Sequence, residues 1–193
     1  MIPSTIASEL ASHHAVLDQT AEQSAEAVGK IIDAIVTCFQ LGNKLLICGN
    51  GGSAADSQHV AGEFVNRFAF DHPALPAIAL TTDTSVLTCI ANDSAFENIF
   101  SRQVEALGKS GDILVGISTS GGSKNVLKAL DTARQRGLTT IAFTGENGRS
   151  GMAAQCDLSL VVLSADTPRI QECHIFIWHV ICEAVESTLF TRS

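Results

Sequence analysis

A glycine-rich turn after the first short apolar run of the chain is the earliest segment that can do chemistry. The run covers residues 44–48, the turn covers residues 49–53, and a helical pattern begins at Ala54. Glycines let a ligand approach the backbone closely, and the free amides at a helix N-terminus favour an anion. We expect Ser53 to cap this helix and Asp56 to lie at its third position. The alternative is a tight, well-capped turn that binds nothing.

Hydroxyl groups crowd a second turn of the same kind, which follows the third apolar run, at residues 113–117. This turn combines two glycines with four hydroxyl side chains, Ser118, Thr119, Ser120 and Ser123. Hydroxyl and amide donors can hold a phosphate dianion without a lysine. A serine-rich turn in which Ser123 merely caps the next helix, at residues 124–136, explains only one of these hydroxyls. We therefore favour a phosphate site.

Two further groups of polar side chains are spaced for helices. His59 and Glu63 lie four residues apart and so project from one helix face. Gln171, His174 and His179 stand within an apolar helical run near the end of the sequence, where polar groups need partners. On spacing alone, a pair like the first is usually a solvated surface pair, and the two histidines of the last run are more often satisfied core residues.

The elements that must position these residues alternate between helices and short strands. Apolar residues recur at helical spacing over residues 6–39, which predicts an N-terminal arm of one or two helices whose apolar face exceeds what one sheet can cover. Apolar runs predict five strands, at residues 44–48, 77–80, 113–117, 140–143 and 158–162. This α/β alternation predicts a doubly wound parallel sheet in the order 2-1-3-4-5. The turns after the first and third strands then face each other at the switch point, where such sheets bind ligands.

Length and composition bound the function. The chain has 193 residues, 46% hydrophobic and 17% charged, so we expect one domain over residues 1–193, with the arm at residues 1–41 and the α/β core at residues 42–193. The formal net charge of −8 opposes binding to nucleic acid or an anionic membrane. Six cysteines without a Cys-x-x-Cys pair indicate reduced core residues. Because the pattern contains neither a signal peptide nor a membrane span, we expect a cytoplasmic protein.

The glycine-rich turn also matches the fingerprint G-x-G-x-x-A of dinucleotide-binding domains, through Gly49, Gly51 and Ala54. Such a site needs an acidic residue about 20 positions further on, at the end of the second strand. Asp71 precedes that strand and Asp83 comes too late. A dinucleotide or flavodoxin-like redox function is therefore disfavoured, and visible absorbance or dinucleotide binding would reveal it.

Four segments of the chain together resemble the sugar isomerase (SIS) domain family and, within it, the bacterial phosphoheptose isomerases. The segments are residues 48–53, 91–93, 116–121 and 169–172, and the likeness covers almost the whole chain. The resemblance implies a flavodoxin-like SIS fold. It also implies an aldose-ketose isomerase that converts sedoheptulose 7-phosphate to D-glycero-D-manno-heptose 7-phosphate, a precursor of ADP-heptose for the lipopolysaccharide core.

By this resemblance, the sugar phosphate lies between the two turns. The residues expected to bind it are Asn50, Gly51, Gly52, Ser53, Glu63, Asn92, Asp93, Ser118, Thr119, Ser120, Ser123 and Gln171, with the hydroxyl-rich turn on the phosphate. Glu63 and His179 are expected to be the acid-base pair of an enediol mechanism. Glu63 would move a proton between C1 and C2, and His179 would move one between the oxygens.

The resemblance further implies a cofactor and an assembly. Zn²⁺ is expected at His59, Glu63, Gln171 and His179, where it would polarise the substrate carbonyl. The amphipathic arm and the family likeness both favour a homo-oligomer, and we expect a tetramer. The alternative function is that of a non-catalytic SIS adaptor protein that binds the bacterial replication initiator, but that adaptor lacks counterparts of Glu63 and His179.

Overall fold

Five parallel strands form the centre of the protein. A computed structural model describes residues 2–191 of the chain, and the side chains of residues 5–191. The strands are β1 (Leu45–Gly49), β2 (Ala77–Ala79), β3 (Ile113–Ser118), β4 (Thr139–Gly145) and β5 (Leu158–Val162). Their order is β2-β1-β3-β4-β5, and every neighbouring pair is parallel. The predicted doubly wound sheet and its strand order are confirmed.

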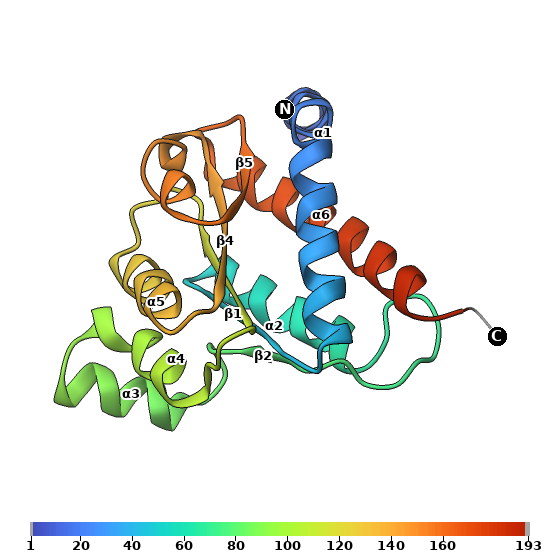
Figure 1. Cartoon of the computed structure of the whole chain (residues 1–193). Helices are drawn as coiled ribbons and strands as arrows, with labels where there is room; N and C mark the ends of the chain where they lie inside the picture. The colour runs from blue at the N-terminus through green and yellow to red at the C-terminus, as the bar shows by residue number, and fades with distance from the viewer. Residues whose placement is uncertain (1, 192–193) are drawn as a thin grey trace.

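Helices cover both faces of this sheet (Figure 1). They are α1 (Ile2–Gln40), α2 (Gly52–Val65), α3 (Thr84–Asp93), α4 (Ser101–Leu107), α5 (Lys124–Gln135) and α6 (Thr167–Leu189), with short 3-10 turns η1 (Phe96–Asn98), η2 (Glu146–Gly148) and η3 (Ala153–Gln155). Helices α1, α2 and α6 share one hydrophobic core with the sheet, and α3, α4 and α5 pack on the other face. The predicted arm is a single continuous helix of 39 residues.

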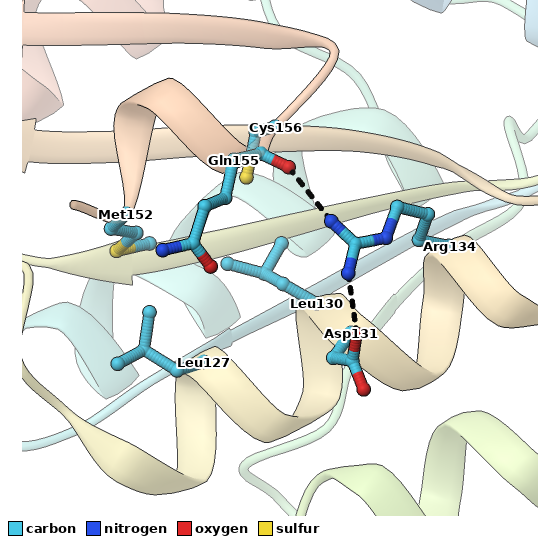
Figure 2. A pocket seen from close by; sticks show the side chains of 7 residues that line it. All are labelled: Leu127, Leu130, Asp131, Arg134, Met152, Gln155 and Cys156. Atoms are coloured by element: carbon cyan, nitrogen blue, oxygen red, sulfur yellow. Dashed lines mark hydrogen bonds and ion pairs between the residues drawn. The ribbon is translucent and has the colours of Figure 1, made fainter. Parts of the chain in front are cut away.

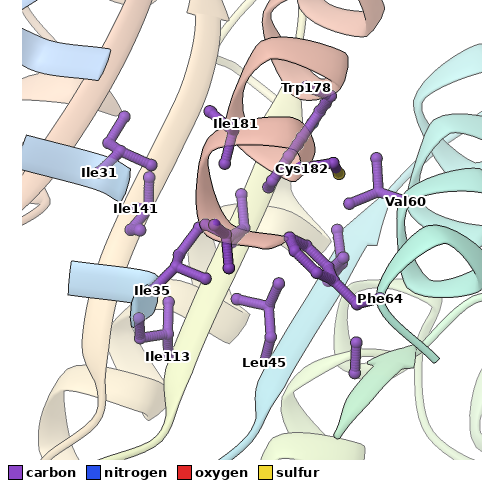
Figure 3. Packing of buried hydrophobic residues seen from close by; sticks show 14 of the residues in the cluster. Ile31, Ile35, Leu45, Val60, Phe64, Ile113, Ile141, Trp178, Ile181 and Cys182 are labelled. Carbon is purple, nitrogen blue, oxygen red and sulfur yellow. The ribbon is translucent and has the colours of Figure 1, made fainter. Parts of the chain in front are cut away.

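The two cores follow from strands that are apolar on both sides. In β1, Leu45 and Ile47 face the core formed with α1, α2 and α6, whereas Leu46 and Cys48 face the core on the other side. Figure 3 shows the first core, in which Trp178 of α6 and Phe64 of α2 point toward the strands. Burial on both faces explains why these strands appear in the sequence as continuous apolar runs.

Apolar side chains remain exposed along α1 and α6. Ile6 and Leu10 of α1 are 63% and 51% exposed, and Phe176 and Val180 of α6 are 45% and 41% exposed. Between the two helices, an apolar groove is lined by both. The arm therefore carries more apolar surface than the sheet of its own chain covers, as the sequence predicts.

All six cysteines are unpaired, but they are not all core residues. Four are buried (Cys38, Cys48, Cys173 and Cys182), Cys156 is half-buried, and Cys89 is exposed on α3. The expectation of six core cysteines is wrong for Cys89, because α3 buries only part of its circumference against the sheet. Within the described residues, no helix combines the length and the apolar character that crossing a bilayer requires.

A small cavity lies where α5 meets the segment around η3 (Figure 2). Arg134 lines the cavity, and its guanidinium already donates to the Asp131 carboxylate at 2.6 Å and to the Gln155 carbonyl. Burial raises the pKa of the Cys156 thiol in its wall to about 11, so the thiol stays protonated at neutral pH. This cavity therefore offers neither a free cation nor a thiolate nucleophile.

Candidate active site

The glycine-rich turn leads directly from β1 into α2. The helix begins at Gly52, and Gly51 occupies the N-cap position with φ of 56° and no side-chain cap. Ser53 is a buried residue of the first helical turn, so its prediction as the N-cap is wrong, and so is the third helical position for Asp56. The physical reason is the positive φ of Gly51, which turns the chain into the helix earlier than a serine cap would.

Close packing explains two of the other glycines in this turn. A Cβ at Gly49 would lie 2.7 Å from Cβ of Ser53, and a Cβ at Gly52 would overlap the amide group of Gln171. Gln171 lies in the first turns of α6. The absence of side chains thus lets the start of α2 approach the start of α6, and the sequence-predicted residue Gln171 meets the glycine-rich turn.

The hydroxyl-rich turn follows β3 and presents its side chains unequally. Ser118 is buried and donates a hydrogen bond to Oγ of Ser123 at 2.9 Å. Ser120 is exposed, and its Oγ accepts the N–H of Gly122 at 3.2 Å, which leaves its own hydroxyl proton free. Thr119 and Ser123 are half-buried. Ser120 is therefore the hydroxyl of this turn that is best placed to donate to a ligand.

A pair of asparagines joins the two turns. Nδ2 of Asn50 donates to Oδ1 of Asn125 at 2.9 Å, and Nδ2 of Asn125 donates to Oδ1 of Asn50 at 2.8 Å. This contact confirms that the turns after β1 and β3 face each other. Sequence reasoning missed Asn125, although a polar residue beside Val126 on the buried face of α5 was a signal.

Three predicted site residues converge between α2 and α6. Nε2 of His59 lies 2.9 Å from Oε1 of Glu63, and Nε2 of His179 lies 3.5 Å from Nε2 of His59. One ligand atom from each of the three residues lies within 4.8 Å of the others. His59 is exposed, whereas Glu63 and His179 are half-buried. The helical pair on α2 is thus part of a larger cluster that α6 completes.

Two groups near the cluster, the Asp56 carboxyl and the Cys182 thiol, have raised pKa values. Burial raises the pKa of the Asp56 carboxyl, and the nearby His59 only partly opposes this shift. Oδ2 of Asp56 is buried without a hydrogen-bond partner. The pKa of the Cys182 thiol, on α6, is raised by burial first and then by the charges of Glu63 on α2 and Glu186 on α6. Sequence reasoning identified Asp56 only as a helix-start residue and did not connect it with the cluster.

The cluster has the chemistry of a zinc site. Two imidazole nitrogens and a carboxylate oxygen are common zinc ligands, and ligands of a tetrahedral ion with bonds of about 2.0–2.1 Å lie about 3.4 Å apart. The two facing Nε2 atoms are 3.5 Å apart and need a proton or a cation between them. His59, Glu63 and His179 therefore fit the ion, while the contact that the structure gives Gln171 is with Gly52.

His174 does not join this cluster. It is fully buried, its ring lies edge-on to Phe143, and burial lowers its pKa to about 4, so the ring is neutral at neutral pH. Nε2 lies 3.4 Å from the carbonyl of Thr144, and Nδ1 has no partner. His174 is thus a core residue, but the expectation of a satisfied core histidine is wrong because its Nδ1 has no partner. His179 is half-buried in the cluster, so the core interpretation is wrong for it.

Asn92 and Asp93 stand apart from the other predicted site residues. They end α3, are exposed, and hydrogen-bond to each other at 2.7 Å. Helix α3 packs on the face of the sheet opposite to α2 and α6, which carry His59 and His179. Their side chains bond to each other, and neither joins the cluster of His59, Glu63 and His179.

Comparisons with known proteins give the family. The SIS domain model matches residues 10–145. A phosphoheptose isomerase of Trichlorobacter lovleyi is 52% identical over 187 residues, covering 97% of this chain and 95% of the relative. The structures of phosphoheptose isomerases from Neisseria gonorrhoeae and Francisella tularensis superpose with TM-scores of 0.91 and 0.93, at 40% and 36% identity, each over 97% of this chain and 100% and 99% of theirs. The chain therefore belongs to the SIS-domain family and, within it, to the phosphoheptose isomerases.

Proposed function

We propose that this chain isomerises sedoheptulose 7-phosphate to D-glycero-D-manno-heptose 7-phosphate. The observation that carries the proposal is the meeting of Glu63 and His179, from two different helices, in one half-buried cluster. A carboxylate and an imidazole are the groups that proton transfer between adjacent carbons and oxygens requires. Both side chains belong to helices that begin at the carboxyl edge of the sheet, where the turns expected to bind substrate also lie.

The chemistry assigned to the pair is an enediol isomerisation. Glu63 removes the proton from the carbon next to the carbonyl and returns it to the neighbouring carbon, while His179 moves a proton between the two oxygens. His59, which is hydrogen-bonded to Glu63 at 2.9 Å, limits the orientation of that carboxylate. The acid-base work then needs groups whose proton affinity suits neutral pH, as a carboxylate and an imidazole can have.

The phosphate of the substrate is assigned to the hydroxyl-rich turn. Ser120 has a free hydroxyl proton and is exposed, and Thr119 and Ser123 flank it. The net charge of −8 means that local donors must hold the anion. The glycine-rich turn, including Asn50, Gly51, Gly52 and Ser53, is assigned to the sugar, with Gln171 beside Gly52.

We also propose a zinc ion at the cluster. His59, Glu63 and His179 would hold it, and Gln171 would need to turn from Gly52 to complete the set. When bound, zinc supplies Lewis-acid polarisation of the substrate carbonyl. A carboxylate that binds a metal is a weaker base, so Glu63 would need loose or changing coordination to act on carbon.

A homotetramer is the assembly that we propose. Helices α1 and α6 carry exposed apolar side chains, at Ile6 and Leu10 and at Phe176 and Val180. Burying these side chains between copies of the chain would stabilise an oligomer. Asn92 and Asp93 are exposed and do not join the cluster of this chain, so in this proposal they serve the site of a neighbouring copy. Light scattering at micromolar concentration tests the assembly, and an active monomer would contradict it.

The proposed setting is the cytoplasm, with the product supplying ADP-heptose for the lipopolysaccharide core. Cell fractionation, and the lipopolysaccharide of cells that lack the gene, test this setting.

The biochemical experiment that tests the function is incubation of purified protein with sedoheptulose 7-phosphate, followed by identification of the product. A matched sample of Glu63→Gln excludes a contaminating isomerase. Turnover of other sugar phosphates without turnover of this heptulose would overturn the assignment of substrate.

A further inference from the structure

Glu186, near the end of α6, is a buried carboxylate bonded to a distant part of the chain. It is 2% exposed. Its Oε1 accepts the backbone N–H of Phe68 at 2.9 Å, and its Oε2 accepts that of Ala69 at 2.9 Å. A buried carboxylate is costly unless such donors satisfy it. The two bonds therefore hold the backbone at residues 68–69 in place against α6.

His72 strengthens the same connection. Its Nε2 lies 3.1 Å from Oε1 of Glu186, and both side chains are at most 2% exposed. The His72 ring stacks on Phe190 with centroids 4.8 Å apart and planes 5° apart. The segment at residues 66–76, which joins α2 to β2, is thereby tied to the end of α6. In Figure 1 this connection runs beside the C-terminal end of that helix.

Phe68 brings this anchored segment to the active-site cluster. Its ring lies against the ring of His179, with centroids 5.5 Å apart and planes tilted by 36°. Glu186 follows His179 by seven residues on the same helix, so the two residues share a face about 10 Å apart. Glu186 is thus too distant to contact His179, and Phe68 connects the two through its backbone N–H group and its ring.

The orientation of the His179 ring matters for the cluster. Nε2 of His179 faces Nε2 of His59, and the ring of His59 packs edge-on to it with centroids 5.2 Å apart. Rotation of an imidazole by half a turn about χ2 replaces a ring nitrogen by a carbon at the same place. Neighbours that restrict this rotation therefore decide which atom of His179 faces His59 and Glu63.

We propose that Phe68 and Glu186 are positioning residues for His179. Glu186 fixes the backbone that carries Phe68, and the Phe68 ring restricts the rotation of the His179 imidazole so that Nε2 faces the cluster. The kinetic consequence rests on the proposed acid-base role of His179, whereas the ring orientation is a property of the protein without substrate.

Substitutions at Phe68 test the inference in the full-length protein. Phe68→Leu keeps apolar packing and removes the ring, so kcat should fall about tenfold while KM changes less than about twofold. Phe68→Tyr restores a ring and should recover most of kcat. Phe70→Leu makes the same exchange two residues away, at a side chain without a ring contact to His179, and should leave both constants unchanged. An equal loss in Phe68→Leu and Phe70→Leu would overturn the positioning role.

Glu186→Gln tests the anchor. An amide has one acceptor oxygen, whereas each carboxylate oxygen of Glu186 accepts a backbone N–H group, so the Phe68 backbone should loosen. In ¹⁵N-labelled protein, the His179 ring resonances, assigned by their loss in His179→Gln, should shift in Glu186→Gln toward their positions in Phe68→Leu. Circular dichroism shows whether Glu186→Gln is folded. If part of the sample is unfolded, the His179 resonances of the folded molecules still report the ring orientation.

The readouts separate the two proposals. Wild-type protein that fails to turn over sedoheptulose 7-phosphate would overturn the proposed function, yet the resonances of His179 would still test its positioning. Folded Glu186→Gln or Phe68→Leu with wild-type His179 resonances would overturn the positioning role, even if kcat fell. Shifted His179 resonances together with a reduced kcat and a steady KM would support it.

Discussion

Asn50 and Asn125 exchange two amide hydrogen bonds, of 2.9 and 2.8 Å, across the gap between the glycine-rich turn and the first turn of α5. Oδ1 of Asn125 also accepts the N–H of Val126 at 2.9 Å, and Asn125 is 2% exposed. The pair therefore sets the distance between the two turns that are proposed to hold one substrate. A sheet positions the ends of its strands, but side chains must fix the turns beyond them.

Asn125→Leu should destabilise the protein because it leaves the buried part of the Asn50 amide without a partner. We expect a loss of about 1–3 kcal/mol in the free energy of unfolding. Urea denaturation measures it. The single variants Asn50→Ala and Asn125→Ala and their combination form a double-mutant cycle, in which a coupling energy near zero would contradict the role of the pair.

Ser120→Ala should raise KM for the sugar phosphate more than it lowers kcat, because Ser120 has a free hydroxyl proton and does not touch the acid-base cluster. Loss of one hydrogen bond to a charged group corresponds to about a tenfold rise. Ser118→Ala is the matched comparison, since Ser118 is buried and already donates to Ser123. Ser118→Ala should lower the stability of the protein more than it weakens substrate binding. A collapse of kcat in Ser120→Ala at unchanged KM would contradict the assignment of the phosphate to this turn.

Removal of metal should reduce activity if the cluster holds zinc, and added zinc should restore it. We expect His59→Ala to lose bound zinc, as measured by elemental analysis, because His59 contacts both Glu63 and His179. His14→Ala, which removes an exposed histidine outside the cluster, is the control. The zinc content of Gln171→Ala would establish whether Gln171 is a ligand. Full activity in metal-free protein would contradict the zinc proposal.

Asp112 should make stability depend on pH. Burial alone would raise the pKa of its carboxyl, but hydrogen bonds from Lys44 and Lys109 together with the charge of Lys44 outweigh burial and lower the pKa below its ordinary value of 3.8. A depressed pKa contributes stability above the unfolded-state value, which is lost as pH falls through the folded-state value. Asp112→Asn should therefore be less stable than wild type at pH 7. Denaturation at a series of pH values should show that the difference in the free energy of unfolding between wild type and variant becomes smaller below pH 3.8. A gap that stays constant down to the lowest pH would contradict this linkage.

The sheet could be predicted from the sequence because its strands are buried on both faces. Residues 113–117 read as one apolar run, and β3 is buried throughout. The start of α2 could not be predicted as well, since Ser53 is a good cap by residue type and nothing in the sequence reveals that Gly51 adopts a positive φ. Local preferences favoured the serine, and the backbone conformation of the turn decided against it.

The active-site cluster was only partly visible in the sequence. His59 and Glu63 share a helix face by spacing, but His179 lies 120 residues from His59 and meets it only because α2 packs beside α6. Family resemblance nominated the three residues together, whereas periodicity treated His174 and His179 alike. Phe68 and Glu186 escaped sequence analysis because their connection runs through backbone N–H groups, which no side-chain pattern records.

Glu63→Gln should abolish most of the activity if Glu63 is the carbon base. The amide keeps the shape of the side chain and can still contact His59, but it cannot accept a proton from carbon. We expect kcat to fall by about 10²- to 10⁴-fold. Glu105→Gln, at an exposed carboxylate bonded to Arg102 on α4, is the matched control and should behave as wild type.

Solvent deuterium identifies the step that Glu63→Gln removes. A base that carries a proton between C1 and C2 exchanges it in part with water, so wild-type protein in heavy water should place deuterium at C2 of the aldose product. Glu63→Gln should lose this label together with turnover, while substrate still binds. The zinc content of the variant shows whether the substitution also removed a metal ligand. Label that enters unchanged in Glu63→Gln would assign the carbon base to His179 or to another group, because a side chain without proton affinity cannot carry the exchange.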